Sequence, residues 1–129
     1  MNKENINSLA LAYLGDAVYE VYIRFYLLKD NIKVGDLQKR AISYVSAKAQ
    51  SSYLDKMIES NFLSKEEIDI VKRARNHKSH KSPKGTNIID YKKSTGLEAL
   101  IGYLKIMNNE DRIKEIIEYI VGDRFESIW

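Results

Sequence analysis

Apolar residues recur at helical spacing throughout residues 6–28, and this stretch constrains the fold more than any other. One face carries seven of them: Leu11, Leu14, Val18, Val21, Tyr22, Phe25 and Leu28. Much of the other side is also apolar or aromatic, through Leu9, Tyr13, Tyr19 and Ile23. A helix that is apolar on nearly all sides has to be covered on several of them. We therefore expect its own domain to cover it, and a partner chain could cover it as well.

The remaining segments show the same periodicity. We expect further helices over residues 36–44, 46–60, 64–75, 92–107 and 108–122. The sequence LSKEEI indicates a helix start, because Ser64 can cap the helix and Glu67 can complete a capping box. Leu63 and Ile68 can add the hydrophobic staple. With no alternating strand and no internal repeat, we expect an all-α fold in a single domain, residues 1–129.

The last two expected helices each have an apolar face. We expect their inward positions to be Leu97, Leu100, Ile101, Leu104 and Met107, followed by Ile113, Ile116, Ile117 and Ile120. The second of these helices should stop around Gly122, because glycine ends helices readily.

The composition, with 44% apolar and 30% charged residues, is typical of a soluble globular protein. The absence of cysteine excludes disulfides, thiolate metal sites and a cysteine nucleophile, and it fits a reducing compartment. The N-terminus does not resemble a signal peptide, because its apolar run is short and breaks at Gly15 and Asp16. No segment approaches the roughly 18 apolar residues of a membrane span. We expect a cytoplasmic protein that does not bind a membrane.

The net charge of +3 is unevenly distributed along the chain. The run KRARNHKSHKSPK, residues 72–84, carries a charge of +6 and is named the basic segment below. Its cations are Lys72, Arg73, Arg75, Lys78, Lys81 and Lys84, with Lys92 and Lys93 behind them. The rest of the chain therefore sums to −3. Such a segment favours a polyphosphate partner, although a solvated lysine loop has the same composition.

Two acidic residues stand in otherwise apolar helical sequence. Asp16 lies in LAYLGDAVYEVY, and Glu98 lies in STGLEALIGYL. Gly15 directly precedes Asp16, and Gly102 follows Glu98 by one turn. Glycine inside a helix costs about 1 kcal/mol relative to alanine, so its presence there needs a reason. Two glycines without side chains would let the two helices cross closely and bring Asp16 and Glu98 together.

Two carboxylates that face each other repel unless a proton or a cation lies between them. Mg²⁺ suits such a pair, because it binds through one or two carboxylates, keeps several waters and takes phosphate oxygens as further ligands. Alternatively, Asp16 and Glu98 are ordinary acids paired with lysine or arginine at helix edges. Glu20, one turn after Asp16, either assists the metal site or is a solvated edge residue.

Other site patterns are weak. His77 and His80 have a His-x-x-His spacing, but the neighbouring cations oppose metal binding there. The sequence shows no clear Ser-His-Asp arrangement and no GxxxxGK[ST] phosphate-binding loop.

The segments LAYLGDAVYE and STGLEALIGYL resemble the two acidic motifs of the ribonuclease III endonuclease domain, Leu-Gly-Asp-(Ala/Ser)-Val and Glu-Ala-Leu-Ile-Gly. The resemblance covers essentially the whole chain. It is closest to Mini-ribonuclease III, the short bacterial form that consists of the catalytic domain alone. Further similarities to that form lie at Arg75-Asn76, the Lys-Ser pairs, Pro83-Lys84, Tyr91 and Ser94-Thr95. The resemblance implies an all-α bundle of about seven helices that forms a homodimer.

Asp16 and Glu98 match two acids that bind metal in the family at large. The resemblance implies that these two are the catalytic residues and hold Mg²⁺, with Mn²⁺ as a substitute. Ala12 and Thr95 stand where ordinary ribonuclease III has a glutamate and an aspartate. Because Mini-ribonuclease III proteins resemble this sequence in both replacements, we interpret them as a trait of the subfamily. Thr95 is then expected to hydrogen-bond a metal-bound water, with Glu20 as a further candidate.

The resemblance also implies the assembly and the substrate. Two signature helices pack across a twofold axis in this family, which places Tyr13 in the dimer interface. The chain ends without a separate double-stranded RNA-binding domain, so the basic segment is expected to hold the RNA. The expected reaction cuts double-stranded RNA to 5′-phosphate and 3′-hydroxyl ends. It would mature the precursor of 23S ribosomal RNA, with a large-subunit ribosomal protein or the pre-ribosome as a further partner.

Two other functions remain alternatives. The two replaced acids would also fit a catalytically inactive dimer that binds double-stranded RNA. A helical protein-interaction module with an incidental basic segment would have no affinity for RNA.

Overall fold

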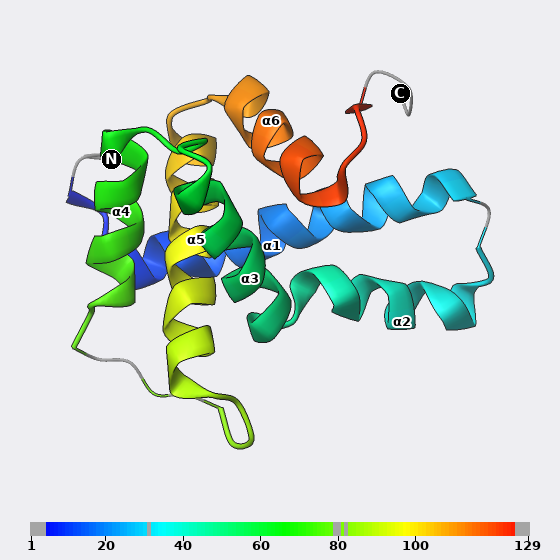
Figure 1. The fold of residues 1–129 in the computed structure, drawn as a ribbon, viewed down its shortest axis with the longest axis horizontal. Helices are drawn as coiled ribbons and strands as arrows, with labels where there is room; N and C mark the ends of the chain where they lie inside the picture. The colour runs from blue at the N-terminus through cyan, green and yellow to red at the C-terminus, as the bar shows by residue number, and fades with distance from the viewer. Residues whose placement is uncertain (1–4, 31, 79–80, 82, 126–129) are drawn as a thin grey trace.

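The computed structural model describes residues 5–30, 32–78, 81 and 83–125, and all regular secondary structure over these residues is helical. The α-helices are α1 (Ser8–Leu27), α2 (Val34–Val45), α3 (Ala47–Glu59), α4 (Lys65–Arg75), α5 (Ile88–Ile106) and α6 (Glu110–Val121) (Figure 1). A short 3₁₀ helix, η2 (Leu28–Asp30), follows α1. The predicted all-α fold is confirmed, with six α-helices and one 3₁₀ helix described where about seven helices were expected.

Helix α5 forms the centre of the molecule. It contacts α1, α3, α4 and α6, and Figure 1 shows α1 crossing it while α4 and α6 lie around it. The core is aliphatic, and its fully buried members include Ile23, Leu97, Leu100, Ile101 and Ile117. The inward positions predicted for α5 and α6 are therefore confirmed, apart from Met107. Met107 is half-exposed because it is the C-cap of α5 and lies beyond its last buried turn.

Side chains cap the helix starts. The predicted capping box of α4 is present: the Glu67 N–H donates to Ser64 Oγ, and the Ser64 N–H donates to Glu67 Oε1 at 2.9 Å. Asn87 caps α5 by accepting hydrogen bonds from two backbone N–H groups. This cap explains why α5 begins at Ile88, about one turn before the predicted start at residue 92. At the other end, Gly122 closes α6 in a left-handed conformation, as expected.

Gly15 and Gly102 allow α1 and α5 to touch backbone to backbone. A Cβ atom on Gly15 would lie 1.6 Å from the Glu98 carbonyl oxygen. One on Gly102 would lie 2.0 Å from the Leu11 carbonyl oxygen. Neither distance is sterically possible, so the crossing requires glycine at both positions. The close helix crossing predicted from these glycines is confirmed.

Helix α1 is buried on one side only. Tyr19 and Ile23 are fully buried, whereas an apolar stripe on the opposite side is exposed, formed by Tyr13, Ala17, Val21, Phe25 and Leu28. The C-terminal half of α1 and the neighbouring α2 project from the rest of the molecule (Figure 1). Among the described residues no helix has the length and apolar character needed to cross a membrane.

Candidate active site

The crossing of α1 and α5 brings Asp16 and Glu98 to the wall of one cavity of about 420 Å³. Asp16 extends from the exposed side of α1, while Glu98 is largely shielded on α5. The first turn of α3 and the connection between α4 and α5 complete the wall. The structure thus joins two acids that are distant in sequence.

The environment of Glu98 favours its neutral form. Burial and the adjacent charge of Asp16 raise the pKa of Glu98 to about 8, and a hydrogen bond from Gln50 partly opposes this rise. Within the described part of the chain, neither Asp16 nor Glu98 forms an ion pair with a lysine or arginine. Among the described residues, the pair therefore differs from ordinary helix-edge acids, which pair with a lysine or arginine.

The donor set of this cavity fits Mg²⁺. Asp16 and Glu98 offer hard carboxylate oxygens, and the cavity has room for the waters that this ion retains. The described residues contain no group of three or more histidine, aspartate or glutamate side chains that could form a metal cage. Two carboxylates with several waters match the coordination that Mg²⁺ prefers better than they match a Zn²⁺ site.

The other predicted residues lie at different places. Thr95 is buried in the cavity wall, where its hydroxyl donates to the Tyr91 carbonyl at 2.9 Å. Tyr13 is 86% exposed at the rim. Glu20 does not line the cavity and accepts a hydrogen bond from Arg24 at 2.8 Å. Its charge still adds a small contribution to the raised pKa of Glu98.

Gln50 is a site residue that the sequence reasoning missed. Its Nε2 group donates to Glu98 Oε2 at 3.2 Å and to the Val45 carbonyl at 3.0 Å. The available signal was its position on the inward face of α3, because Leu54 and Met57 follow at helical spacing and are buried. A glutamine in such a position indicates a specific polar partner.

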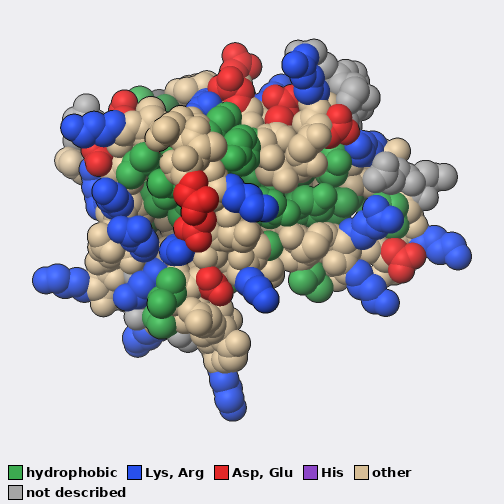
Figure 2. Space-filling view, viewed as in Figure 1, with side chains coloured by type: hydrophobic (Ala, Val, Ile, Leu, Met, Phe, Trp, Pro, Cys, Tyr) green, Lys and Arg blue, Asp and Glu red, His purple; other side chains and the backbone are tan. Residues whose placement is uncertain are grey.

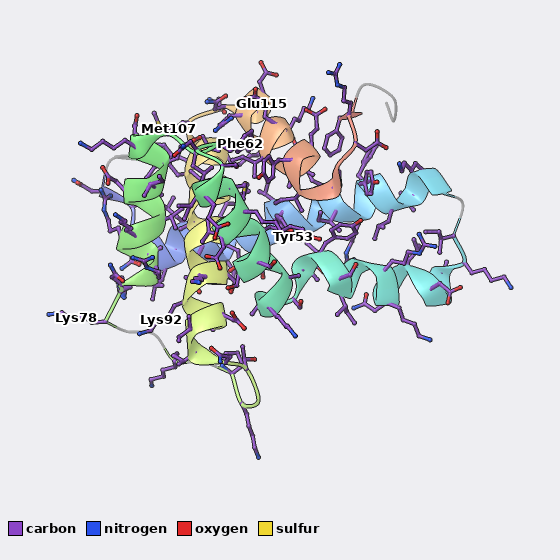
Figure 3. The ribbon with its side chains drawn as sticks, in the orientation of Figure 1. Tyr53, Phe62, Lys78, Lys92, Met107 and Glu115 are labelled. Atoms are coloured by element: carbon purple, nitrogen blue, oxygen red, sulfur yellow. The ribbon has the colours of Figure 1, made fainter. Side chains whose placement is uncertain are left out.

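The basic segment reaches the same cavity. Lys81 and Pro83 line it together with the two acids. Figure 2 shows Lys and Arg side chains gathered over the end of α4 and the connection that follows. In Figure 3, Lys78 extends outwards from this connection, and Lys92 lies on the same side on the first turns of α5. The fold therefore places cationic side chains beside the carboxylate pair.

The cations of the basic segment are available to a ligand. None of its six lysines and arginines forms an ion pair with an acid in the part of the chain that the structure describes. Lys93 differs, because it pairs with Asp55 of α3 at 3.0 Å. The His-x-x-His spacing includes His80, which lies outside the described residues.

Comparison with known proteins identifies the family. A sequence model of the Ribonuclease III domain matches residues 9–109. The chain is 42% identical to Mini-ribonuclease 3 of Enterococcus faecalis, over 92% of this chain and 90% of that protein. It is 47% identical to Mini-ribonuclease 3 of Brevibacillus brevis, over 87% and 83% of the two chains. The chain belongs to the Mini-ribonuclease 3 family. It is accordingly an endoribonuclease, and the resemblance stated from its two acidic motifs is confirmed.

A solved structure supports the same relationship. A crystal structure of a Fusobacterium nucleatum protein superposes with a TM-score of 0.83 at 36% sequence identity. The match covers 92% of this chain and 95% of the other. Within this Mini-ribonuclease 3 fold, the cavity with Asp16 and Glu98 is the candidate active site.

Proposed function

We propose that this chain cleaves double-stranded RNA in a reaction that requires Mg²⁺ held by Asp16 and Glu98. The observation that carries the proposal is the shared cavity, in which both carboxylates and Lys81 of the basic segment line one wall. Carboxylates suit the metal and a lysine suits the phosphate, so the cavity combines the two requirements of phosphodiester hydrolysis.

Different residues of the cavity have different proposed roles in the reaction. Asp16 and Glu98 would supply the ligand oxygens, and Glu98 would hold a cation as the ionised carboxylate, having released its proton to water. Thr95 lines the same cavity as the pair, and its hydroxyl oxygen could accept a hydrogen bond from a bound water. When bound, Mg²⁺, or Mn²⁺ in its place, would lower the pKa of a water and neutralise charge on the phosphate. The proposed products carry 5′-phosphate and 3′-hydroxyl ends.

The basic segment is the proposed RNA-binding surface. Duplex RNA is bound mainly through its shape, phosphates and 2′-hydroxyls, which exposed lysine and arginine side chains can contact. Lys72, Arg73 and Arg75 extend from the last turn of α4, and Lys78, Lys81 and Lys84 continue along the connection to α5. This arrangement would lead an RNA backbone to the carboxylate pair.

We further propose a twofold dimer through the exposed stripe of α1. Tyr13 and Val21, which are 86% and 63% exposed, belong to this apolar surface. A cavity of about 500 Å³ beside it, lined partly by Val21 and Phe25, could receive an aromatic side chain from the partner. A twofold axis would provide two active sites, one for each RNA strand.

The proposed natural substrate is the precursor of 23S ribosomal RNA, processed in the cytoplasm by the whole 129-residue chain acting as one domain. The resemblance to Mini-ribonuclease III supports this substrate. A large-subunit ribosomal protein or the pre-ribosome is a further proposed partner.

The test compares the wild type with Asp16→Asn on an end-labelled RNA duplex, with Mg²⁺ or with EDTA. We expect the wild type to cut the duplex but not a single strand, and only with metal. Asp16→Asn should lose at least about 10²-fold in rate, because it removes a metal ligand, while it still dimerises and binds RNA. Binding without cleavage under any divalent metal would favour the inactive RNA-binding dimer instead. Normal cleavage by Asp16→Asn would refute the proposed site.

A further inference from the structure

We propose that Gln50 is a positioning residue that orients Glu98 for metal binding. The inference rests on the proposed function, because it assumes that Asp16 and Glu98 hold a divalent cation. Gln50 lies in the first turn of α3, is only 1% exposed and lines the same cavity as the two acids. It is therefore an amide built into the wall of the carboxylate site.

Its hydrogen bonds define which way the amide points. Nε2 donates to Glu98 Oε2 and to the carbonyl of Val45, the last residue of α2. A backbone carbonyl only accepts hydrogen bonds, so the NH₂ end of Gln50 has to face Val45, and the same Nε2 also reaches Glu98 Oε2. Because one of these partners is backbone, the junction of α2 and α3 sets the position of the amide. The amide in turn holds one oxygen of Glu98.

The other end of the amide also indicates a ligand. Gln50 Oε1 is buried and accepts no hydrogen bond from the described part of the chain. A buried carbonyl without a hydrogen-bond donor destabilises the folded state, and an apolar side chain would match its neighbours Leu54 and Met57 on the inward face of α3. A residue that breaks the local pattern at a stability cost is characteristic of a functional site. A water of a hydrated cation held by the two carboxylates is a donor of the right kind.

The experiment measures Mn²⁺ binding to the full chain without RNA, by isothermal titration calorimetry, for the wild type and Gln50→Leu. We expect Gln50→Leu to bind Mn²⁺ about tenfold more weakly, because residues that orient metal ligands contribute this much to affinity. Its metal-free stability in urea should change little, because the loss of the unpaired Oε1 offsets the loss of the hydrogen bonds to Val45 and Glu98. Gln50→Met provides the same comparison should Gln50→Leu fail to fold.

Met57→Leu is the matched control. It introduces the same side chain on the buried face of the same helix, away from the cavity, and should retain the wild-type affinity for Mn²⁺. Unchanged Mn²⁺ affinity in Gln50→Leu, with or without lower stability, would overturn the positioning role while leaving the metal site in place. If the wild type binds Mn²⁺ no more tightly than Asp16→Asn does, the proposed metal site is overturned, and this inference with it.

Discussion

Glu98 is a carboxyl group held where its charge is unfavourable. Burial and the neighbouring Asp16 both favour the protonated form, whereas the hydrogen bond from Gln50 favours the ionised one. A cation between the two carboxylates would reverse this preference, because its charge outweighs the repulsion between them. At the scale of single residues, the ionised form of Glu98 is thus disfavoured in the empty site and would be favoured when the site holds a metal.

The raised pKa of Glu98 predicts how stability depends on pH. Between an ordinary pKa of 4.5 and about 8, the folded state holds a proton that the unfolded state has lost. The free energy of unfolding of the metal-free protein should therefore fall as pH rises across this window. Glu98→Gln cannot titrate, so it should lose this dependence and be more stable than the wild type near pH 8, by on the order of 3 kcal/mol.

Urea unfolding in EDTA, repeated from about pH 5 to about pH 8, measures both effects. Parallel pH profiles for the wild type and Glu98→Gln would contradict the prediction.

At the scale of helices, two contacts between elements position the site. The glycines of α1 and α5 set the distance between the helices that carry Asp16 and Glu98. Arg112 of α6 fixes the start of α4, because it donates to both carboxylate oxygens of Glu67 and to the Phe62 carbonyl, each at 2.8 Å. Glu67 thus serves the capping box and an interhelical ion pair together. These contacts orient α4, which leads into the basic segment.

The helix crossing predicts opposite outcomes for two glycine-to-alanine changes. Gly15→Ala places a methyl group on the Glu98 carbonyl and should destabilise the fold by about 3 kcal/mol or more, because the helices must move apart. Gly35→Ala in α2 is the matched control. Nothing lies within 4 Å of its added Cβ, so it should leave stability unchanged or raise it by about 0.4–1 kcal/mol.

Thermal and urea unfolding of both variants test the prediction. Equal stabilities of Gly15→Ala and Gly35→Ala would show that the crossing tolerates a side chain.

At the scale of the whole molecule, charge and apolar surface are segregated. The basic segment lies beside the candidate active site, whereas the exposed stripe of α1 is apolar. Exposed aromatic and branched side chains along one helix face mark an interaction surface on a soluble protein. This segregation is consistent with the two proposed interfaces, one for RNA and one for a second copy of the chain.

The basic segment predicts salt-dependent RNA binding. About six neutralised phosphates would lower affinity roughly 10³-fold between about 50 and 200 mM salt. Replacing Lys78, Lys81 and Lys84 with alanine should weaken binding and reduce the slope of log affinity against log salt by about 1 for each phosphate that is no longer neutralised.

Gel-shift or fluorescence titrations at several salt concentrations measure this slope. The control replaces Lys33, Lys39 and Lys65, which lie elsewhere in the chain, with alanine. It removes the same charge and should weaken RNA binding less. Equal effects of the two triple variants would remove the basic segment from the RNA-binding surface.

If the proposed dimer forms through the apolar stripe, Val21→Asp should dissociate it. A carboxylate at this position would be buried against the partner without a cation, which costs several kcal/mol of association energy. Ile42→Asp on α2 is the control, since Ile42 is similarly apolar and exposed but lies off the stripe. Light scattering after size-exclusion chromatography distinguishes the two, and a dimeric Val21→Asp would place the interface elsewhere.

The sequence by itself determined the helices and the two acids of the candidate site. Helical periodicity is a local property, so it located nearly every helix, and the LSKEEI pattern predicted the capping box that Ser64 and Glu67 form. Asp16 and Glu98 stood out because an acid close to a glycine is unusual in an apolar helix. The early start of α5 was also encoded locally, in Asn87, but its capping role was not recognised.

Only the tertiary structure decided which other residues share the cavity with the two acids. Gln50 meets Glu98 across 48 positions of sequence, and Lys81 reaches the carboxylates from the connection between α4 and α5. Lys93, next to Lys92 in sequence, is instead bound to Asp55. These contacts depend on how separate helices pack, and spacing along the chain carries information only about neighbours within one helix. Periodicity could therefore predict each helix, while the partners across the cavity followed from the packing of all of them.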